Sequence, residues 1–480
     1  MSDTNNKEQK KEWSTFKKWI VSILIILLTL VVILGGTICA LYIRSATYKP
    51  NTQKPNIDTK SEFVTQGNEN GTKRAIYDKD GNRLQIKGIN AGNVLVQEGW
   101  MSPFDNDPKK DEDGNLIKDN DGNLTYAEFT QEDFEEGLSN NPNLKGNKDE
   151  LMNLYYKSFF SEDDFKKVKE LQFNTIRLPF YWRNILNDDF TRKDESVAFS
   201  YLDWFVEQCK VNDLYAILDL HGVPGSQNGF EHSGLFLEQP TFWHNETYEN
   251  AVIDLWDYVS EHYTNNRKDI APWILSYDVI NEPQSSKNKN QDKYCTDYQD
   301  KLYKAIRENN DQHLITLEFM WDYSVCPNPD KYGWSNIMYE LHQYNWNSNL
   351  INLETFKSYF DSKLLGHDYD VPIYIGEFNW FENLDSWKKC LVDWYDDRGY
   401  GWTIWNYKTT VTGGWTSSWG VYTAQMKLNK KKEETKVNIH TCTLDEYKKA
   451  CELVKTENCA TSFTYDMINM YNTEWKVKIV

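Results

Sequence analysis

The hydrophobic and polar positions after residue 73 follow two alternating periodicities. Short apolar runs rich in β-branched residues alternate with longer stretches of helical spacing, the order typical of βα units and a parallel sheet. Candidate strands lie near Ile86 and at 174–180, 214–221, 274–282, 314–319, 337–344, 373–377 and 402–407. Candidate helices lie at 162–171, 201–211, 248–263, 292–307, 353–364 and 384–397, with only a loop between strands 314–319 and 337–344. Eight strands in this order predict an α/β fold of the (β/α)8 TIM barrel type.

The N-terminal region predicts a membrane anchor. Residues 19–43 carry no charge and are mostly aliphatic, long enough to cross the hydrocarbon layer. Five lysines precede this run, so we expect residues 1–18 to form a cytoplasmic tail and the chain after Arg44 to lie outside the cell. A cleaved signal peptide is the alternative, but the run exceeds the usual apolar region and no clear A-x-A site follows. Residues 44–72, polar and proline-containing, are expected to be a linker.

An acidic insert rich in Gly and Asn occupies residues 103–147. Asp119, Asp121, Gly122 and Glu128 fall at positions 3, 5, 6 and 12 of a calcium-binding loop. Position 1 is Ile117, which cannot supply the first carboxylate. We therefore interpret the insert as Asp-Gly turns and not as a calcium site.

The barrel domain is expected to span residues 73–425, followed by an extension at 426–480 packed on the barrel. The extension opens on a basic run at 427–436, and Thr443 with Glu446 has the spacing of a helix capping box. Of the eight cysteines, Cys39 lies in the predicted span, and Cys209 and Cys390 are expected to be buried thiols. Candidate disulfides are one between Cys295 and Cys326 and one among Cys442, Cys451 and Cys459.

Composition narrows the choice of function without fixing it. The formal net charge is -19 and the pI is about 5.0, with no basic stripe in the predicted domain, which argues against nucleic-acid binding. Nineteen Trp and thirty Tyr suit the apolar faces of sugars, although aromatic side chains are equally ordinary core material.

Two candidate strands deliver a glutamate at their ends. Glu282 follows the apolar run of LSYDVINEPQ, and Glu377 follows that of PIYIGEFNW. A parallel barrel brings strand ends that are distant in sequence to one edge. Hydrolysis of a glycosidic bond requires such a pair of carboxyl groups.

Other ionisable and aromatic residues collect at the same strand ends. Arg177 closes NTIR, Asp219 and His221 share one face of LDLHG, His342 and Tyr344 share one face of LHQY, and Trp405 lies on the last strand. Each residue alone is more often structural. Together they favour a functional site, because a purely structural sheet would have turn residues there.

The chain resembles glycoside hydrolase family five, and more narrowly its exo-1,3-beta-glucanase-like branch, over about residues 74–425. The motifs are GINAGNVLVQEGW, NTIRLPFYW, LDLHGVPGSQNGF, INEPQ, LHQY, IYIGEF and WTIWNYK. The resemblance implies Glu282 as general acid/base and Glu377 as nucleophile of a retaining mechanism that needs no metal or other cofactor. It implies a supporting set: Arg177, His221, Asn281, His342, Tyr344 and Trp405, with Glu98 on the terminal sugar.

The resemblance implies a retaining beta-glycosidase acting on beta-glucan or a beta-glucoside, and the predicted anchor implies that it is membrane-anchored and faces outward. We expect a carboxyl separation of ~5 to 5.5 Å and a Glu282 pKa raised by burial and by Glu377. The chain departs from the branch in GFEHSG at 229–234, where GFDNSG is usual, and in AGNVLV at 91–96, where LGGWLV is usual. A beta-1,4- or beta-1,6-glucanase and a non-catalytic surface carbohydrate-binding protein are the alternatives.

Overall fold

The computed structural model describes residues 62–69, 72–111, 113–119, 124–286, 291–344, 352–364, 366–367, 369–410, 419–427 and 435–475. The chain divides into one unit at 1–55 and a second at 56–480, and the second contains all the described residues. The predicted tail at 1–18 and span at 19–43 lie outside them. Within the described ranges, a search for a helix with the length and apolar character of a bilayer span finds none.

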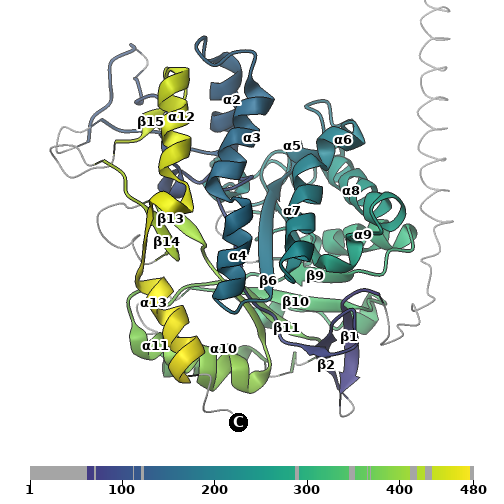
Figure 1. The fold of residues 1–480 in the computed structure, drawn as a ribbon. Coiled ribbons are helices and arrows are strands. Elements are labelled where there is room, and N and C mark those ends of the chain that lie inside the picture. Colours follow the sequence, from purple (N-terminus) through teal and green to yellow (C-terminus); the bar gives the residue numbers. More distant parts are fainter. Residues whose placement is uncertain are drawn as a thin grey trace, which may run out of the picture. The chain divides into compact units, whose positions relative to one another are not determined.

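Eight parallel strands close into a barrel (Figure 1). The strands are β4 (Lys87–Asn90), β6 (Thr175–Tyr181), β7 (Tyr215–Gly222), β8 (Ile274–Asp278), β9 (Leu314–Glu318), β10 (Ile337–Gln343), β11 (Ile373–Phe378) and β12 (Gly401–Ile404). They follow this order around the barrel, and β12 pairs with β4 to close it. All eight predicted strands are confirmed. The predicted strand at 274–282 ends earlier, at Asp278, because Asn281 already donates its backbone N–H to Leu220 beyond the ladder.

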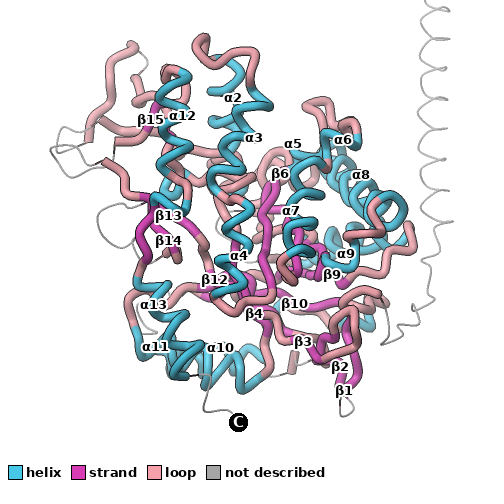
Figure 2. Tube along the Cα trace, in the orientation of Figure 1, coloured by secondary structure: helices cyan, strands magenta, loops and turns pink. Residues whose placement is uncertain are grey.

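Helices surround the strands (Figure 2). The predicted helices correspond to α4 (Glu162–Glu170), α7 (Ser200–Val211), α8 (Glu246–Glu261), α9 (Lys293–Glu308), α10 (Leu353–Leu364) and α11 (Leu384–Cys390). Between β9 and β10 the described chain forms only two 3-10 turns, η5 (Tyr323–Val325) and η6 (Pro329–Lys331), so the expected loop is confirmed.

A three-stranded antiparallel sheet covers the amino-terminal end of the barrel. Its strands are β1 (Thr65–Glu69), β2 (Thr72–Tyr77) and β3 (Arg83–Leu84). Val64 and Ile76 from this region are buried against strand residues such as Leu275 and Met338. The small sheet thus fills one end of the barrel with apolar side chains, and polar side chains collect at the opposite, carboxyl end.

Two helices were not predicted from the sequence: α2 (Gln131–Asn140) lies in the acidic insert, and α3 (Lys148–Phe159) follows directly after it. Thr130 caps α2: its hydroxyl accepts from the N–H of Asp133, whose carboxylate accepts from the N–H of Thr130. Earlier in the insert, Asp111 accepts backbone N–H bonds in the expected Asp-Gly turn. Four positions of the considered calcium loop, 120–123, lie outside the described residues.

The C-terminal segment packs beside the insert (Figure 1). β15 (Val437–Asn438) pairs with β5 (Phe104–Asp105), and α12 (Leu444–Leu453) starts at Thr443, whose capping box with Glu446 is confirmed. The Tyr447 ring on α12 stacks on Phe104 at 5.0 Å. Further on, β16 (Cys459–Thr461) extends the small sheet of β13 (Lys408–Thr410) and β14 (Tyr422–Ala424), and α13 (Phe463–Met470) follows.

The seven described cysteines form no disulfide. The considered bridges, Cys295 with Cys326 and one among Cys442, Cys451 and Cys459, are therefore wrong. Cys209 and Cys390 are buried thiols as expected, and Cys295 and Cys326 are buried as well. Free cysteine packs as a small apolar side chain, so core position accounts for these residues without a crosslink.

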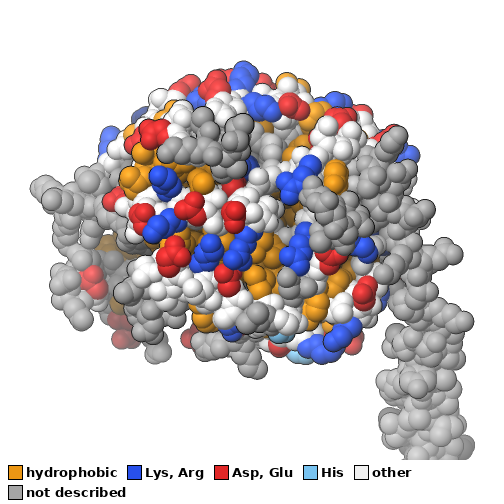
Figure 3. Space-filling model, turned by 90° about the horizontal axis from the view of Figure 1, so that it is seen from below, with side chains coloured by type: hydrophobic (Ala, Val, Ile, Leu, Met, Phe, Trp, Pro, Cys, Tyr) orange, Lys and Arg blue, Asp and Glu red, His pale blue; other side chains and the backbone are white. Residues whose placement is uncertain are grey.

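Charges of both signs are mixed on the molecular face seen from below (Figure 3). Lys and Arg side chains alternate there with Asp and Glu side chains, and apolar side chains lie between them. A mixed surface of this kind has no large field of one sign on that face, although the whole chain carries a formal charge of -19.

Candidate active site

Arg177 on β6 is the centre of a buried polar cluster at the carboxyl end of the barrel. Its guanidinium donates two hydrogen bonds to Oδ2 of Asp278, at 2.9 and 2.8 Å, and one to Oε1 of Glu377 at 2.9 Å. It also lies 3.2 Å from Asp219 and 3.4 Å from Glu340. Burial opposes the charge of Arg177, but these carboxylates outweigh burial and raise its pKa, so the cation persists.

A single imidazole connects the two predicted carboxylates. Nδ1 of His342, on β10, lies 2.8 Å from Oε1 of Glu282 and 3.5 Å from Oε2 of Glu377. Since both oxygens contact one atom, Glu282 and Glu377 share a site although 94 residues separate them in the sequence. The structure therefore brings together the two strand-end glutamates that the sequence singled out.

Both oxygens of Glu377 are held. Oε1 accepts from Arg177, and Oε2 accepts from the hydroxyl of Tyr344 at 3.0 Å. Burial, and then the charge of Glu377, raise the pKa of Tyr344 well above its ordinary value, so this phenol remains a donor. Donors on both oxygens fix the orientation of the carboxylate.

Glu282 lies just beyond β8 in a backbone conformation that is rare for its residue type. Its φ is 41°, in the left-handed region that a non-glycine residue adopts at a cost of about 1–3 kcal/mol. The backbone N–H of Glu282 donates to the carboxylate of Glu318 on β9, and Asn228 donates to its carbonyl oxygen at 3.3 Å. Strained backbone held by such bonds is typical of functional positions.

The acidity of Glu282 differs from the sequence-based expectation. Burial raises its pKa, but His232 and His342 contact its two oxygens at 3.1 and 2.8 Å and outweigh burial, so the pKa lies well below its ordinary value. The expected upward shift is therefore wrong for the free protein. The sequence reading counted burial and Glu377 but could not place His232 against this carboxylate.

His342 is surrounded by four carboxylates. Besides Glu282 and Glu377, its Nε2 lies 3.4 Å from Glu340 and 3.6 Å from Glu318. Burial lowers the pKa of His342, but these charges outweigh it and raise the pKa well above the ordinary value. The imidazolium therefore offsets carboxylate charge at the place where both predicted glutamates meet.

His221, on β7, is held in its neutral form. Burial is the largest influence and lowers its pKa well below the ordinary value. Its Nδ1 lies 2.7 Å from Oδ2 of Asp219, and burial raises the pKa of that carboxyl. The His221 ring stacks on Trp405 with a centroid distance of 5.6 Å and an interplanar angle of 7°. The peptide bond after Trp405 is cis.

Aromatic side chains from three loops gather next to this polar cluster. Met101, Trp405 and Trp419 form a buried apolar group, against which Trp100 and Tyr344 pack. The indole N–H of Trp100 donates to Oε2 of Glu98 at 2.7 Å. Burial raises the pKa of Glu98 to about 8, and the nearby charge of His232 opposes this shift. Glu98 is thus also near the cluster, as expected.

Four contributors to the site escaped the sequence reading. Asp278, Glu318 and Glu340 lie on strands, and His232 lies in the 3-10 turn η2 (Glu231–Ser233) after β7. Strand alternation carried a signal for Glu340, which precedes His342 by two residues on the same face. The sequence contains no comparable signal for His232. Its ring is oriented by a loop, and a loop has no periodic pattern from which the direction of a side chain could be predicted.

Asn281 completes the contacts of the predicted site residues. Its side-chain oxygen accepts from Arg177 at 2.8 Å, and its carbonyl oxygen accepts from the side-chain amide of Gln227 at 2.9 Å. All nine predicted site residues thus lie in or beside one cluster at the carboxyl ends of the strands. They are Glu98, Arg177, His221, Asn281, Glu282, His342, Tyr344, Glu377 and Trp405.

Three side chains of the cluster also have the spacing of a metal site. Among the described residues, Glu282, Glu318 and His342 each present one ligand atom, all within 4.8 Å of one another. These groups are already bonded to each other, His342 to Glu282 and the N–H of Glu282 to Glu318. We therefore assign them to charge balance and proton handling at the strand ends and not to metal binding.

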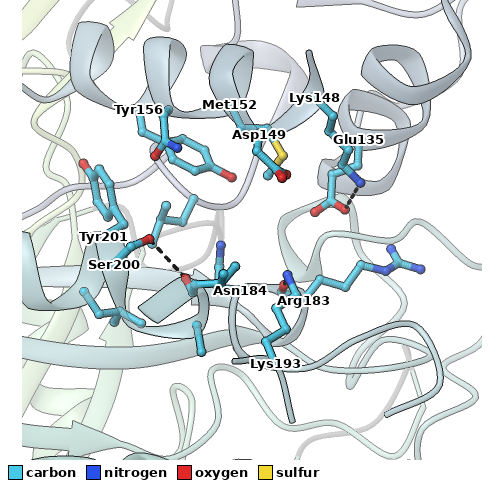
Figure 4. Close-up of a pocket in the computed structure, with 15 residues that line it drawn as sticks. Glu135, Lys148, Asp149, Met152, Tyr156, Arg183, Asn184, Lys193, Ser200 and Tyr201 are labelled. Carbon is cyan, nitrogen blue, oxygen red and sulfur yellow. Dashed lines mark hydrogen bonds and ion pairs between the residues drawn. The ribbon is translucent and has the colours of Figure 1, made fainter. Parts of the chain in front are cut away.

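A separate cavity of about 160 Å³ lies outside the barrel, beside α3 and α7 (Figure 4). Three of its charged side chains, Glu135, Lys148 and Arg183, take part in ion pairs. Lys148 lies 3.1 Å from Glu135, and Arg183 lies 2.9 Å from Glu132. The ion pairs indicate that these charged residues of the cavity have a structural role, and we assign no catalytic function to the cavity.

A closed parallel barrel with two carboxylates bridged at its carboxyl end defines the class of glycoside-hydrolase-type TIM barrels. Residues 129–410 match the profile described as cellulase, glycosyl hydrolase family 5. The chain belongs to glycosyl hydrolase family 5.

Relatives with assigned names cover different parts of the chain. It is 33% identical over 193 residues to a "Beta-xylosidase" of Phanerodontia chrysosporium, covering 39% of this chain and 38% of that protein. It is 34% identical over 156 residues to "Glucan 1,3-beta-glucosidase 2" of Candida albicans, covering 30% and 31%. The chain thus spans about a third of the length of these two relatives. It is 25% identical over 422 residues to "Glucan 1,3-beta-glucosidase I/II" of Saccharomyces cerevisiae, covering 74% and 87%.

Solved structures agree on the fold. A crystal structure of AoRut aligns with a TM-score of 0.51 at 15% identity, covering 68% of this chain and 90% of that one. A rutinosidase from Aspergillus niger aligns with a TM-score of 0.50 at 15% identity, covering 69% and 92%. At this level of identity the likeness concerns the fold alone.

Proposed function

We propose that this protein is a retaining beta-glycosidase that hydrolyses O-glycosidic bonds of beta-glucans or beta-glucosides. The observation that carries the proposal is the bridging of Glu282 and Glu377 by Nδ1 of His342, at 2.8 and 3.5 Å. The two bridged oxygens must therefore lie closer together than the ~6.5 Å at which the spacing of inverting enzymes begins. This spacing supports direct attack by one carboxylate over activation of a water held between two.

In the first step Glu377 is the nucleophile. Its carboxylate attacks the anomeric carbon, the bond to the leaving oxygen breaks, and Glu282 gives that oxygen a proton. Arg177 and Tyr344 hold the two oxygens of Glu377 and so orient the carboxylate for attack. The product of this step is a glycosyl ester on Glu377 and a free alcohol.

In the second step water replaces the ester. Glu282, now ionised, takes a proton from the water as its oxygen attacks the anomeric carbon, and the carboxylate of Glu377 leaves. Asn281 is suited to hydrogen-bond the sugar 2-hydroxyl, and Trp405 to support the ring. By resemblance His221 and His342 are supporting residues, and Glu98 contacts the terminal sugar.

The proposal is tested with a mechanism-based label. The full-length protein is incubated with a 2-deoxy-2-fluoro-β-glucoside that carries a good leaving group, then digested and analysed by mass spectrometry. We expect one sugar adduct on the peptide that contains Glu377, and a loss of activity by more than about 10³-fold in Glu377→Gln. Glu354→Gln, an exposed change on α10, is the control. Undiminished activity of Glu377→Gln would refute the assignment, and binding without turnover would favour a non-catalytic carbohydrate-binding protein.

A beta-xylosidase is a second candidate because a relative with that printed name is 33% identical over 193 residues. Parallel assays with nitrophenyl β-glucoside and β-xyloside separate the two sugars. Laminarin, cellulose and pustulan, offered side by side, separate 1,3-linkage from 1,4- and 1,6-linkage. A clear preference for the xyloside would overturn the glucan assignment while leaving the mechanism unchanged.

We also propose the domain boundaries expected from the sequence, including the membrane anchor. In this arrangement residues 1–18 are cytoplasmic, 19–43 span the membrane, 44–72 are a linker, 73–425 form the extracellular barrel domain and 426–480 form its extension. The support for the anchor is the uncharged run at 19–43 and the lysines before it. Release of the barrel domain from intact cells by added protease would agree with this orientation, and full recovery in the supernatant without protease would contradict it.

A further inference from the structure

We propose that His232 is a positioning residue that shares the acid/base proton with Glu282 and holds that proton in reserve for the leaving group. The inference rests on the proposed function. It concerns a residue in the GFEHSG segment, where the chain departs from the usual pattern of the branch that it resembles. His232 was not among the predicted site residues.

The geometry gives His232 a direct connection to Glu282. Its Nε2 lies 3.1 Å from Oε2 of Glu282, while the other carboxylate oxygen, Oε1, contacts His342. Each oxygen of Glu282 therefore has its own imidazole. The His342 ring is fully buried among four carboxylates, whereas the side chain of His232 is 21% exposed. Of these two histidine rings, His232 is the one that is accessible to solvent and to the leaving group of a bound substrate.

Asn228 favours transfer of the shared proton from His232 to Glu282. The oxygen of its amide accepts from the N–H of Phe230 at 2.9 Å, so the amide nitrogen points at Nε2 of His232, 2.8 Å away. When the proton lies on Nε2, it bonds to Oε2 of Glu282, and Nε2 has no lone pair for the amide. When the proton moves to Oε2, the single lone pair of Nε2 becomes available to the Asn228 amide. The amide thus compensates His232 for the proton that it gives up.

The turn that carries His232 is held in place. The hydroxyls of Ser226 and Ser233 lie 2.6 Å apart, and Ser233 donates to the carbonyl oxygen of Phe230 at 2.7 Å. Gly234, with φ 81°, ends the turn in the conformation that glycine tolerates. The His232 ring stacks on Phe230 with a centroid distance of 5.6 Å. These contacts hold the imidazole beside the carboxylate before any substrate binds.

The charges around the pair determine when it loses its proton. Burial opposes protonation of His232, but Glu282 outweighs burial and, with Glu231 and Glu98, raises its pKa to about 9. The ring of His221, neutral, lies 6.1 Å away. The other ionisable groups near Glu282 are His342, Glu318, Glu377, Asp219 and Tyr344. The pair as a unit therefore retains one proton to higher pH than an isolated glutamate would.

The proton balance of the first step follows from this arrangement. As the leaving oxygen departs, the proton passes from Nε2 to Oε2 and from Glu282 to that oxygen, leaving both groups without it. In the second step Glu282 takes a proton from water and the pair regains its starting charge. The pair of an ionised Glu282 and a protonated His232 thus serves as the proton donor, although the pKa of Glu282 itself is low.

The test compares His232→Asn with the wild type over a range of pH. kcat/KM is measured on phenyl β-glucoside, whose departure requires a proton, and on dinitrophenyl β-glucoside, whose departure does not. In the variant, we expect the alkaline limb of the pH profile of kcat/KM for the phenyl substrate to move to lower pH by at least about one unit. The reason is that Glu282 then holds its proton without His232. The limb for the dinitrophenyl substrate stays in place. His440→Asn, the same chemical change in the C-terminal segment, leaves both limbs unchanged.

Each outcome decides a different question. An unmoved limb for the phenyl substrate in His232→Asn overturns the inference, and equal losses on both substrates assign His232 a structural role only. If His232→Asn does not fold, His232→Gln, which keeps an amide near the position of Nε2 but does not titrate, is measured in its place. A wild type that hydrolyses neither substrate nor the corresponding β-xylosides contradicts the proposed function itself.

Discussion

At the residue scale, Arg177 lies beside four acidic side chains, as many as surround His342. It contacts Asp219, Asp278, Glu340 and Glu377, and its side chain and those of three of these carboxylates are fully buried. A buried charge is tolerable only while its partners remain. Exchange of Arg177 alone therefore leaves four acidic side chains without their shared cation.

Replacing Arg177 by Met should destabilise the protein by about 3–5 kcal/mol, because it removes the cation from buried carboxylates. Urea unfolding, followed by circular dichroism, measures the loss. Arg398→Met is the matched control: Arg398 pairs with Asp361 at the surface, where such a pair contributes about 0–1 kcal/mol. Equal effects of the two changes would contradict the assigned importance of the buried cluster.

The nine site residues named from the sequence and its family resemblance lie in or beside one cluster, because barrel closure brings strand ends together regardless of their distance in the chain. The partners that set the protonation of Glu282 were not all foreseeable. His342 follows from strand alternation, but His232 reaches Glu282 only through a turn shaped by Ser226 and Ser233. Its effect reversed the expected direction of the Glu282 pKa shift.

At the element scale, strands β10 and β11 fit together at one glycine. A Cβ atom on Gly376 would lie 1.5 Å from Oε1 of Glu340, so the space of the missing side chain is filled by that carboxylate. The carbonyl oxygen of Gly376 also accepts from Asn90 at 2.9 Å. The close approach lets Glu340 remain in the cluster around Arg177.

Gly376→Ala should therefore destabilise the fold by about 1–3 kcal/mol, the usual effect of overpacking, and should lower activity by displacing Glu340. Adding Glu340→Ala in a double variant removes the clash. We expect the double variant to lose less stability than the sum of the two single variants, as measured by unfolding in urea. Strict additivity would show that the two residues do not compete for one space.

The strands were more predictable than the insert. Apolar β-branched runs identify β6, β7 and β11 locally, because each strand is buried on both faces and needs no partner to be recognised. Helices α2 and α3 were missed, because their acidic, Gly- and Asn-rich surroundings resemble turns. Their apolar faces pack against a segment some 300 residues later, which no local window includes.

At the scale of the whole molecule, the insert and the C-terminal segment depend on each other. The Tyr447 side chain is fully buried, stacks on Phe104 and lies 6.5 Å from the ring of Phe134, and its hydroxyl donates to the carbonyl oxygen of Leu151 at 2.8 Å. One side chain of α12 thus connects β5, α2 and α3.

Tyr447→Ala should destabilise the protein by about 3–5 kcal/mol through the cavity that it leaves. Hydrogen exchange should increase first in α2, α3 and α12, before the barrel strands. Leu444→Ala, at a neighbouring position that is 36% exposed, should change stability by less than about 0.5 kcal/mol. Uniform loss of protection throughout the barrel would instead indicate a single cooperative unit.

Stability should also fall on the alkaline side of neutrality. His232, with a pKa of about 9, and His342, with a raised pKa, bind protons more tightly in the folded chain. Their contribution to the free energy of unfolding is therefore complete below pH ~6.5 and falls as the pH rises, and the part due to His232 is lost through about pH 9. Glu98, with a pKa raised to about 8 by burial, changes stability in the same direction. The urea midpoint should be lower at pH 9 than at pH 6, and this difference should shrink in His232→Asn. A midpoint that rises over this interval would contradict the assigned shifts.

The unlinked thiols bear on how the enzyme can be produced and handled. Since none of the seven described cysteines is crosslinked, the barrel domain needs no oxidative folding pathway. Bacterial expression without an export signal should yield the domain in native form, and dithiothreitol should leave both its melting temperature and its turnover unchanged. An enzyme with this property remains usable in strongly reducing mixtures, where secreted proteins stabilised by disulfides lose their structure.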